Sequence, residues 1–190
     1  DRYEINQVTG PDEWHEPVNN NLYTNYLARW NLKYVLSLLE VMKKEETSSY
    51  NELVEKTGLT EMETAKWKEV QEKIYLPRKE GTKLLEQFEG YFELDNVTIE
   101  KYDENDWPIR PEALKTKKAK ETQINKQADV VMLLHLMGNE FDDETIKENY
   151  AYYEKRTLHG SSLSPSIYSV MGLKVGDDSK AYRYLRRAAF

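Results

Sequence analysis

The feature that most constrains the fold is a run of apolar residues at helical spacing between positions 22 and 45. Apolar residues recur there every four positions: Leu22, Tyr26, Trp30, Tyr34, Leu38 and Met42. Side chains at this spacing share one face of an α-helix, and further apolar residues widen the stripe. The sequence therefore predicts a long helix that is buried on much of its circumference. Asn19 to Asn21 supply N-cap candidates ahead of it.

Similar patterns predict an all-α chain with six substantial helices. Thr60 and Glu63 form a capping-box pattern that starts one helix, and Gly58 ends the shorter helix before it. From residue 123 four more helical segments follow with short connections, which makes neighbouring helices antiparallel. We expect three consecutive helical hairpins. Because the sequence has no repeat of about 34 or 40 residues, a toroid of helix pairs is favoured over a solenoid.

The middle of the chain and its two ends differ from this pattern. We expect a long loop over residues 77–121, with a small β-hairpin where strand-forming residues surround Gly90. Pro108 and Pro111 favour a loop after it. The chain begins within an extended pattern and ends within a helical one, so we expect a fragment of a larger domain.

Composition excludes several classes of function. The net charge is −7, with 34 acidic against 27 basic residues, which argues against a nucleic-acid partner. No apolar run is long enough to span a membrane. Without cysteine the chain has no disulfide or thiolate metal site, which fits a reducing cytoplasm. His15, His135 and His159 lie far apart in sequence, so we expect no metal site, and His135 fits a packing role within "MLLHLM".

Carboxylates crowd the stretch "PDEWHE" ahead of the long helix. Its residues after Pro11 are Asp12, Glu13, Trp14, His15 and Glu16. A glycosidic bond breaks when a carboxylic acid protonates its leaving oxygen, and an apolar wall or a neighbouring charge keeps such an acid protonated. Trp14 is a candidate wall. A solvated acidic loop is the alternative interpretation.

Two further stretches carry candidate ligands. His159, Gly160, Ser161 and Ser162 precede a predicted helix, where backbone N–H groups and hydroxyls suit a phosphate. A serine-rich N-cap explains the same residues.

Lys126 and Gln127 are placed at the start of an apolar helix, where they could bind sugar hydroxyls or form a solvated first turn. The stretch "EQFEGYF", with Gln87 and Tyr91 around Gly90, is also compatible with a sugar.

These stretches together resemble glycoside hydrolase family 65, the inverting α-glucoside phosphorylases. The matching segments occur in order along nearly the whole chain: "TGPDEWHEPVNNNLYTNYLA", "QFEGYF", "KQADVVMLL" and "RTLHGSSLSPSIYS". The resemblance implies an (α/α)₆ barrel, of which residues 1–190 would be about half and the C-terminal part.

The resemblance also implies roles for particular residues. Glu13 would be the general acid, Lys126 and Gln127 would bind the glucosyl unit, and the segment His159 to Ser162 would lie at the phosphate site. Trp14, His15 and Glu16 would line the acceptor side. Family members usually have Tyr at the position of Trp14, which leaves the acceptor sugar open. Another phosphate-contacting histidine segment and a Trp-Asp pair would lie outside this chain.

The implied reaction is inverting phosphorolysis of an α-glucosidic disaccharide, which gives β-D-glucose 1-phosphate. Phosphate is already anionic and needs no catalytic base, so one carboxylate and a phosphate site suffice. A trehalase-like hydrolase would need a second carboxylate, which "HGSSLSPS" does not offer, and a non-catalytic sugar-binding module is the other alternative. We expect a disaccharide and phosphate as partners, no cofactor beyond phosphate as co-substrate, and a cytoplasmic homodimer for the full-length protein.

Overall fold

The computed structural model describes residues 1–189 and divides the chain into two compact units. The first unit contains Asp1–Ile5 and Thr24–Leu76, and the second contains Asn6–Tyr23 and the chain from Pro77 onward. Within residues 1–189 all regular structure is helical, because the β-type pairings are isolated bridges. The all-α prediction is therefore confirmed. No helix in this range has both the length and the apolar character needed to cross a membrane.

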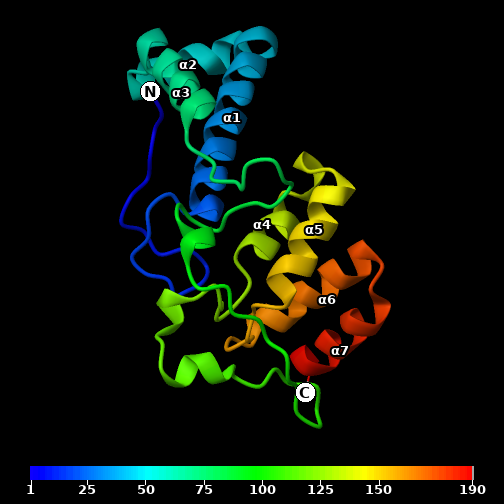
Figure 1. Ribbon diagram of the computed structural model, residues 1–190. Helices are drawn as coiled ribbons and strands as arrows, with labels where there is room; N and C mark the ends of the chain where they lie inside the picture. The colour runs from blue at the N-terminus through cyan, green and yellow to red at the C-terminus, as the bar shows by residue number, and fades with distance from the viewer. Residues whose placement is uncertain (190) are drawn as a thin grey trace. The chain divides into compact units, whose positions relative to one another are not determined.

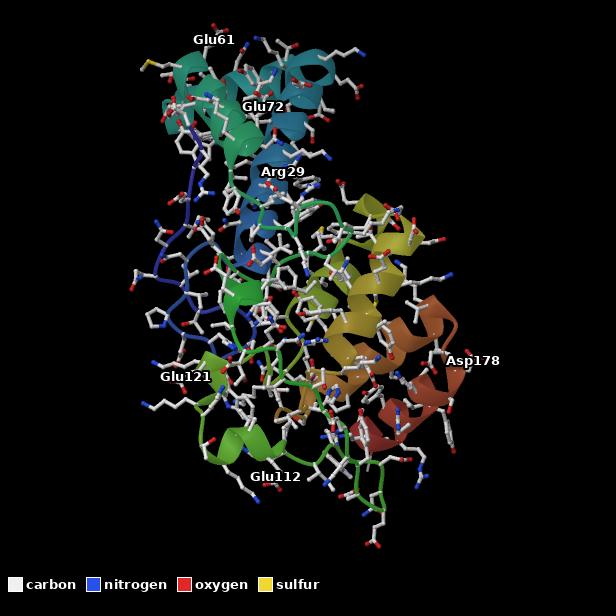
Figure 2. The ribbon with its side chains drawn as sticks, in the orientation of Figure 1. Arg29, Glu61, Glu72, Glu112, Glu121 and Asp178 are labelled. Atoms are coloured by element: carbon white, nitrogen blue, oxygen red, sulfur yellow. The ribbon has the colours of Figure 1, made fainter. Side chains whose placement is uncertain are left out.

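The first unit is built on three α-helices: α1 (Leu22–Glu45), α2 (Thr47–Thr57) and α3 (Glu61–Lys73) (Figure 1). The predicted capping box is present, since the Glu63 N–H donates to Thr60 Oγ1 and the Thr60 N–H donates to the Glu63 carboxylate. Gly58 ends α2 with φ of 69°, in the left-handed region that favours glycine. Glu61 and Glu72 of α3 extend into solvent (Figure 2).

The prediction that α1 is buried on much of its circumference is wrong. Leu22, Tyr26 and Leu39 are buried, but Trp30, Tyr34 and Leu38 are 36, 49 and 42% exposed. The Trp30 and Tyr34 rings stack on each other with centroids 5.2 Å apart, which removes only part of their surface from water. Residues 1–189 therefore cover this face only in part.

The second unit contains α4 (Val130–Leu136), α5 (Asp143–Glu154), α6 (Leu163–Val175) and α7 (Asp178–Ala189). Residues 1–189 thus hold seven α-helices, including the shorter helix predicted to end at Gly58. α6 packs against α4, α5 and α7 (Figure 1). Fully buried Tyr153, Tyr168 and Met171 fill the space between these helices.

The hairpin predicted around Gly90 is wrong. The Gly90 and Phe92 N–H groups both donate to the Glu86 carboxylate, so they are not available to a β-ladder, and a 3₁₀-helix, Tyr91–Glu93, follows. A single antiparallel bridge joins Arg78 and Leu85 instead. The loop beyond contains two more 3₁₀-helices, Glu112–Lys115 and Ala119–Glu121, and its carboxylates Glu112 and Glu121 are exposed (Figure 2).

Candidate active site

The loop ahead of α1 places two adjacent carboxylates in opposite environments. Asp12 is 1% exposed, whereas the Glu13 side chain is 54% exposed. The buried Asp12 carboxylate accepts hydrogen bonds from the Lys126 backbone N–H (2.8 Å), Gln87 Nε2 (3.2 Å) and His15 Nδ1 (2.6 Å). Asp12 is therefore a structural acceptor that holds the loop, and Glu13 is the carboxylate that projects from it.

His15 belongs to the same buried network. Its ring is 2% exposed, and Nε2 donates to the carbonyl oxygen of Thr122 at 2.8 Å. Nδ1 lies 2.6 Å from Asp12 Oδ2. With both nitrogens engaged inside the protein, the ring fixes the loop to residue 122. The predicted contact of His15 with a sugar stays a prediction, and the ring position gives it no support.

Lys126 is the residue that meets Glu13. Its Nζ forms an ion pair with Glu13 Oε2, although the two residues are 113 positions apart. The Gln127 side chain donates to the Pro11 carbonyl oxygen, and its own Oε1 has no hydrogen-bond partner among residues 1–189. The expected helical position of both residues is wrong, because α4 begins only at Val130 and they lie in the preceding loop.

The segment 157–162 lies beside Lys126. The Leu158 N–H donates to the Asn125 carbonyl oxygen (2.9 Å), and the Gly160 N–H donates to the Lys126 carbonyl oxygen (2.7 Å). A Cβ at Gly160 would lie 3.2 Å from Lys126 Cγ, tighter than an ordinary contact, so glycine permits this close approach. The structure thus brings the predicted acid, the predicted sugar-binding lysine and the predicted phosphate segment together.

The four residues of the phosphate segment have different surroundings. His159 is 4% exposed, and its ring lies against Tyr168 and Tyr184 with centroids 4.7 Å from each. Burial lowers the pKa of His159 well below its usual value, and the charges of Arg187 and Arg183 add to the shift, so the ring is neutral.

Gly160, Ser161 and Ser162 lead instead toward the surface at the N-terminus of α6. Partial positive charge and free N–H groups at a helix N-terminus favour a bound anion. The backbone and hydroxyls at Ser161 and Ser162 are therefore nearer the surface than the His159 ring, and the phosphate role of the segment stays a prediction.

The two remaining acceptor-side candidates flank this arrangement. Trp14 is partly buried against an apolar cluster made by Ile99, Leu114 and Ile124. Glu16 is exposed and accepts a hydrogen bond from Thr9 Oγ1 at 3.2 Å. The Trp14 side chain is thus packed against this cluster, and the Glu16 side chain is in solvent.

Sequence reasoning missed the polar interior that assembles the site. Asp129 is 2% exposed and accepts from the Asp12 N–H and from Asn21 Nδ2, both at 3.2 Å. Burial raises the pKa of Asp129 to about 7, and the negative charge of Asp12 adds to the shift. Asn125 and Gln87 are hydrogen-bonded to each other at 2.7 Å in the same interior. The polar positions that flank the apolar run 130–134 were the only local signal.

Two sequence patterns outside the site have surroundings that differ from the prediction. The packing role of His135 is wrong, because this residue is exposed near the end of α4. Gln87, Phe88 and Tyr91 of "EQFEGYF" are buried, and the Tyr91 hydroxyl donates to the Gln123 carbonyl oxygen at 2.6 Å. That stretch therefore contributes to the interior of the unit rather than to an exposed sugar-binding surface.

Known proteins match this chain over its whole length. The model of the glycosyl hydrolase family 65 central catalytic domain matches residues 1–190. Kojibiose phosphorylase of Thermoanaerobacter brockii is 55% identical over 189 residues, which cover 100% of this chain and 24% of that protein. The α,α-trehalose phosphorylase of the same organism is 36% identical, with coverage of 97% and 24%.

A solved structure named as a kojibiose phosphorylase from the human microbiome has a TM-score of 0.79 and 32% identity. The alignment covers 96% of this chain and 25% of that one, so the chain spans about a quarter of the length of its relatives. The expected (α/α)₆ barrel is the fold of this family, and the all-helical chain corresponds to a part of it. The chain belongs to glycoside hydrolase family 65, to whose central catalytic domain it corresponds throughout.

Proposed function

We propose that the full-length protein catalyses inverting phosphorolysis of an α-glucosidic disaccharide and releases β-D-glucose 1-phosphate. The observation that supports this most is the assembly of Glu13, Lys126 and the segment 160–162 by direct contacts in one unit. This arrangement offers one carboxylate and one helix N-terminus of the kind that favours an anion. An inverting hydrolase would need a second carboxylate in place of the phosphate site.

In the proposed reaction Glu13 gives its proton to the glycosidic oxygen as the bond to the anomeric carbon breaks. A phosphate oxygen forms the new bond from the opposite face, which inverts the configuration. Solvent then returns a proton to Glu13. Because Lys126 Nζ contacts the Glu13 carboxylate in the structure, we propose that a bound glucosyl hydroxyl accepts a hydrogen bond from Nζ and frees the carboxyl group to hold its proton.

We further propose kojibiose as the disaccharide. The kojibiose phosphorylase of T. brockii is 55% identical to this chain, and the trehalose phosphorylase of the same organism is 36% identical. A substrate screen of the full-length protein with kojibiose, nigerose, trehalose and maltose, each with inorganic phosphate, tests this choice. Kojibiose should give the highest kcat/KM.

Replacement of Glu13 by Gln tests the assignment of the acid. The amide cannot donate a proton to the leaving oxygen, so kcat for phosphorolysis should fall at least about 100-fold. The product is followed by NMR as the β anomer of glucose 1-phosphate. Glu112→Gln is the matched control, because this exposed carboxylate pairs only with Lys115 among residues 1–189, and its rate should match the wild type. Near-normal turnover by Glu13→Gln would contradict the assignment of Glu13 as the general acid. Glucose release without phosphate would favour a hydrolase.

A further inference from the structure

The phosphate segment is held from behind by a residue of α7. Arg187 Nη2 donates to the carbonyl oxygens of Leu158 (3.4 Å) and His159 (3.3 Å). These carbonyls directly precede Gly160 and the two serines at the start of α6. Arg187 therefore contacts the backbone at the point where the chain turns toward the predicted phosphate site.

The backbone at this point needs such support. His159 has φ of 53°, in the left-handed region that a residue with a Cβ rarely adopts. A residue in that region persists only where its surroundings hold it. The His159 ring is bonded through Nδ1 to Ser164 Oγ at 2.9 Å, and Arg187 holds its carbonyl oxygen. Ring and carbonyl are thus fixed by two different elements.

Arg187 is itself fixed by an aromatic ring. Its guanidinium carbon lies 3.3 Å from the centroid of the Trp107 ring. Trp107 sits on a turn closed by its own N–H, which donates to Asp103 Oδ1 at 2.9 Å. A guanidinium stacked on an indole loses little freedom when it forms hydrogen bonds, because it is already oriented.

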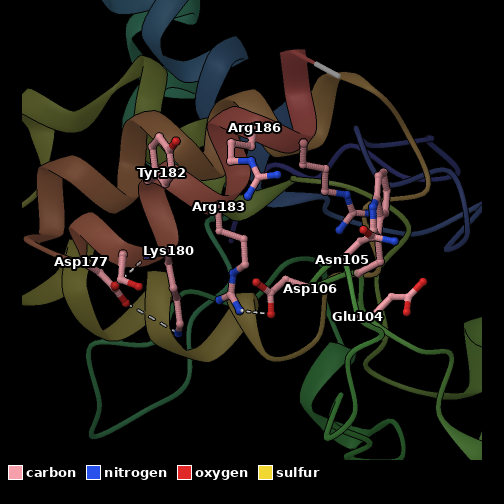
Figure 3. Close-up of a pocket in the computed structure, with 11 residues that line it drawn as sticks. Glu104, Asn105, Asp106, Asp177, Lys180, Tyr182, Arg183 and Arg186 are labelled. Carbon is pink, nitrogen blue, oxygen red and sulfur yellow. Dashed lines mark hydrogen bonds and ion pairs between the residues drawn. The ribbon is translucent and has the colours of Figure 1, made fainter.

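Arg187 forms no ion pair within residues 1–189, although the negative charge of Asp103 lies near enough to raise its pKa slightly. Its Nε and Nη1 have no hydrogen-bond partner among these residues. Burial lowers the pKa of Arg187 to about 10, so it keeps its charge at neutral pH. The neighbouring Arg183, by contrast, pairs with Asp106 at 3.8 Å (Figure 3). An unpaired cation beside the start of α6 favours an anion there.

We propose that Arg187 is a positioning residue for the phosphate segment: it fixes the carbonyls of residues 158 and 159 and places a positive charge behind residues 160–162. This inference rests on the proposed function. Arg187 does not touch the phosphate. It orients the backbone that does, and Trp107 orients Arg187.

The test measures initial rates of kojibiose phosphorolysis by the full-length protein, with phosphate and kojibiose varied in turn. Arg187→Ala should raise KM for phosphate about tenfold and leave KM for kojibiose within twofold. Arg187→Lys keeps the charge but loses the planar stack on Trp107, so it should restore part of the phosphate affinity. Trp107→Leu should raise KM for phosphate in the same direction by a smaller factor.

Arg186→Ala is the matched control. Arg186 is the adjacent, exposed arginine, and both arginines line one cavity of about 1010 Å³ (Figure 3). Loss of either arginine changes the net charge equally. The KM of Arg186→Ala for phosphate should stay within twofold of the wild type. An equal rise for Arg186→Ala and Arg187→Ala would overturn the inference, since net charge alone would then explain the effect.

A readout independent of turnover accompanies the rates. Inorganic phosphate should raise the Tm of the wild type, and this shift should be smaller for Arg187→Ala. If Arg187→Ala does not fold, the KM of Arg187→Lys for phosphate decides, and an unchanged value overturns the inference. A wild type that turns over without phosphate overturns the proposed function and this inference together. A phosphate-dependent wild type with an unchanged KM in Arg187→Ala overturns the inference alone.

Discussion

At the scale of single residues, the position of the proposed acid is set by its neighbour. Asp12 has three donors around its buried carboxylate, and these come from the side chains of His15 and Gln87 and from the backbone of Lys126. The backbone that carries Glu13 is therefore fixed on one side, while the Glu13 side chain remains half exposed. A proton donor needs a fixed backbone position and a side chain that is accessible to the substrate.

Replacement of Asp12 by Asn tests this arrangement. The new amide nitrogen would face donors of His15 and Gln87, so two buried hydrogen bonds would lose their acceptor. We expect the free energy of unfolding to fall by about 2–4 kcal/mol. Urea denaturation measures the change, and hydrogen exchange of the backbone amides of residues 12–15 in the native protein locates it. Glu100→Gln, at an exposed carboxylate, should change it by less than about 0.5 kcal/mol. Equal stability of the two variants would contradict a structural role for Asp12.

The sequence indicates some site residues and not others for a physical reason. Glu13, Lys126 and Gly160 lie in stretches whose residue types already suggest chemistry, and they do come together. Asp12 looked like one more solvent-exposed acid. Its burial depends on partners 75 and 114 positions away, which no local pattern specifies. Arg187 was missed in the same way, because its acceptors are backbone carbonyls.

At the scale of helices, close approach of α6 and α7 organises the second unit. Gly172 lies so near α7 that a Cβ there would be 3.1 Å from both Cα and Cβ of Ala181, and 3.1 Å from the Tyr150 hydroxyl. Small residues on both sides let the two helices meet. The His159 ring is then enclosed by Tyr168 of α6 and Tyr184 of α7, so the packing of this pair reaches the phosphate segment.

Gly172→Ala should separate this pair. Alanine favours a helix more than glycine does, by roughly 1 kcal/mol, but the forced shift of backbone and buried atoms costs about 1–3 kcal/mol. We expect a net loss of about 1 kcal/mol, seen as a lower Tm. Ser166→Ala, on the exposed side of α6, is the control and should not lower Tm. A rise in Tm for Gly172→Ala would show that the helices separate at no cost.

Helix ends were predictable to different degrees. The capping box at Thr60 and the glycine ends at Gly58 and Gly176 are local signals, and the structure has all three. The start of α4 was placed too early because its preceding loop has a helical composition. In the structure the backbone N–H of Lys126 is committed to Asp12 instead of to a helix, and such a choice is set by tertiary contacts.

At the scale of the whole molecule, the polar interior of the second unit links stability to pH. Asp129 has its pKa raised from 3.8 to about 7, because burial and the charge of Asp12 disfavour its carboxylate. The folded protein therefore holds a proton between about pH 4 and pH 7 that the unfolded chain has lost. Stability from this group is complete below pH 4 and is lost as the pH rises through 7.

Asp129→Asn should remove this dependence. The amide oxygen still accepts hydrogen bonds, and the side chain no longer titrates. In the wild type the group contributes a decline in the free energy of unfolding of up to about 4 kcal/mol between pH 4 and pH 7. Urea midpoints at half-unit pH steps should show a flatter profile for Asp129→Asn. Asp178→Asn, at an exposed position (Figure 2), should keep the wild-type slope. Parallel slopes for all three proteins would contradict the assignment.

Because the residues in contact at the site lie far apart in the sequence, the ribosome synthesises them at different times. Glu13 meets Lys126 across 113 positions, and the Asp12 N–H meets Asp129 across 117. Ribosomes add roughly 5–20 residues each second, so about 6–23 seconds pass between synthesis of the acid and synthesis of its lysine. During that interval Glu13 lacks the Lys126 side chain, and the Asp12 carboxylate lacks the Lys126 backbone N–H that donates to it in the folded chain. A nascent chain stalled before residue 126 would thus contain Glu13 without the other site residues. The site forms only when the hydrogen bonds of the buried network have formed.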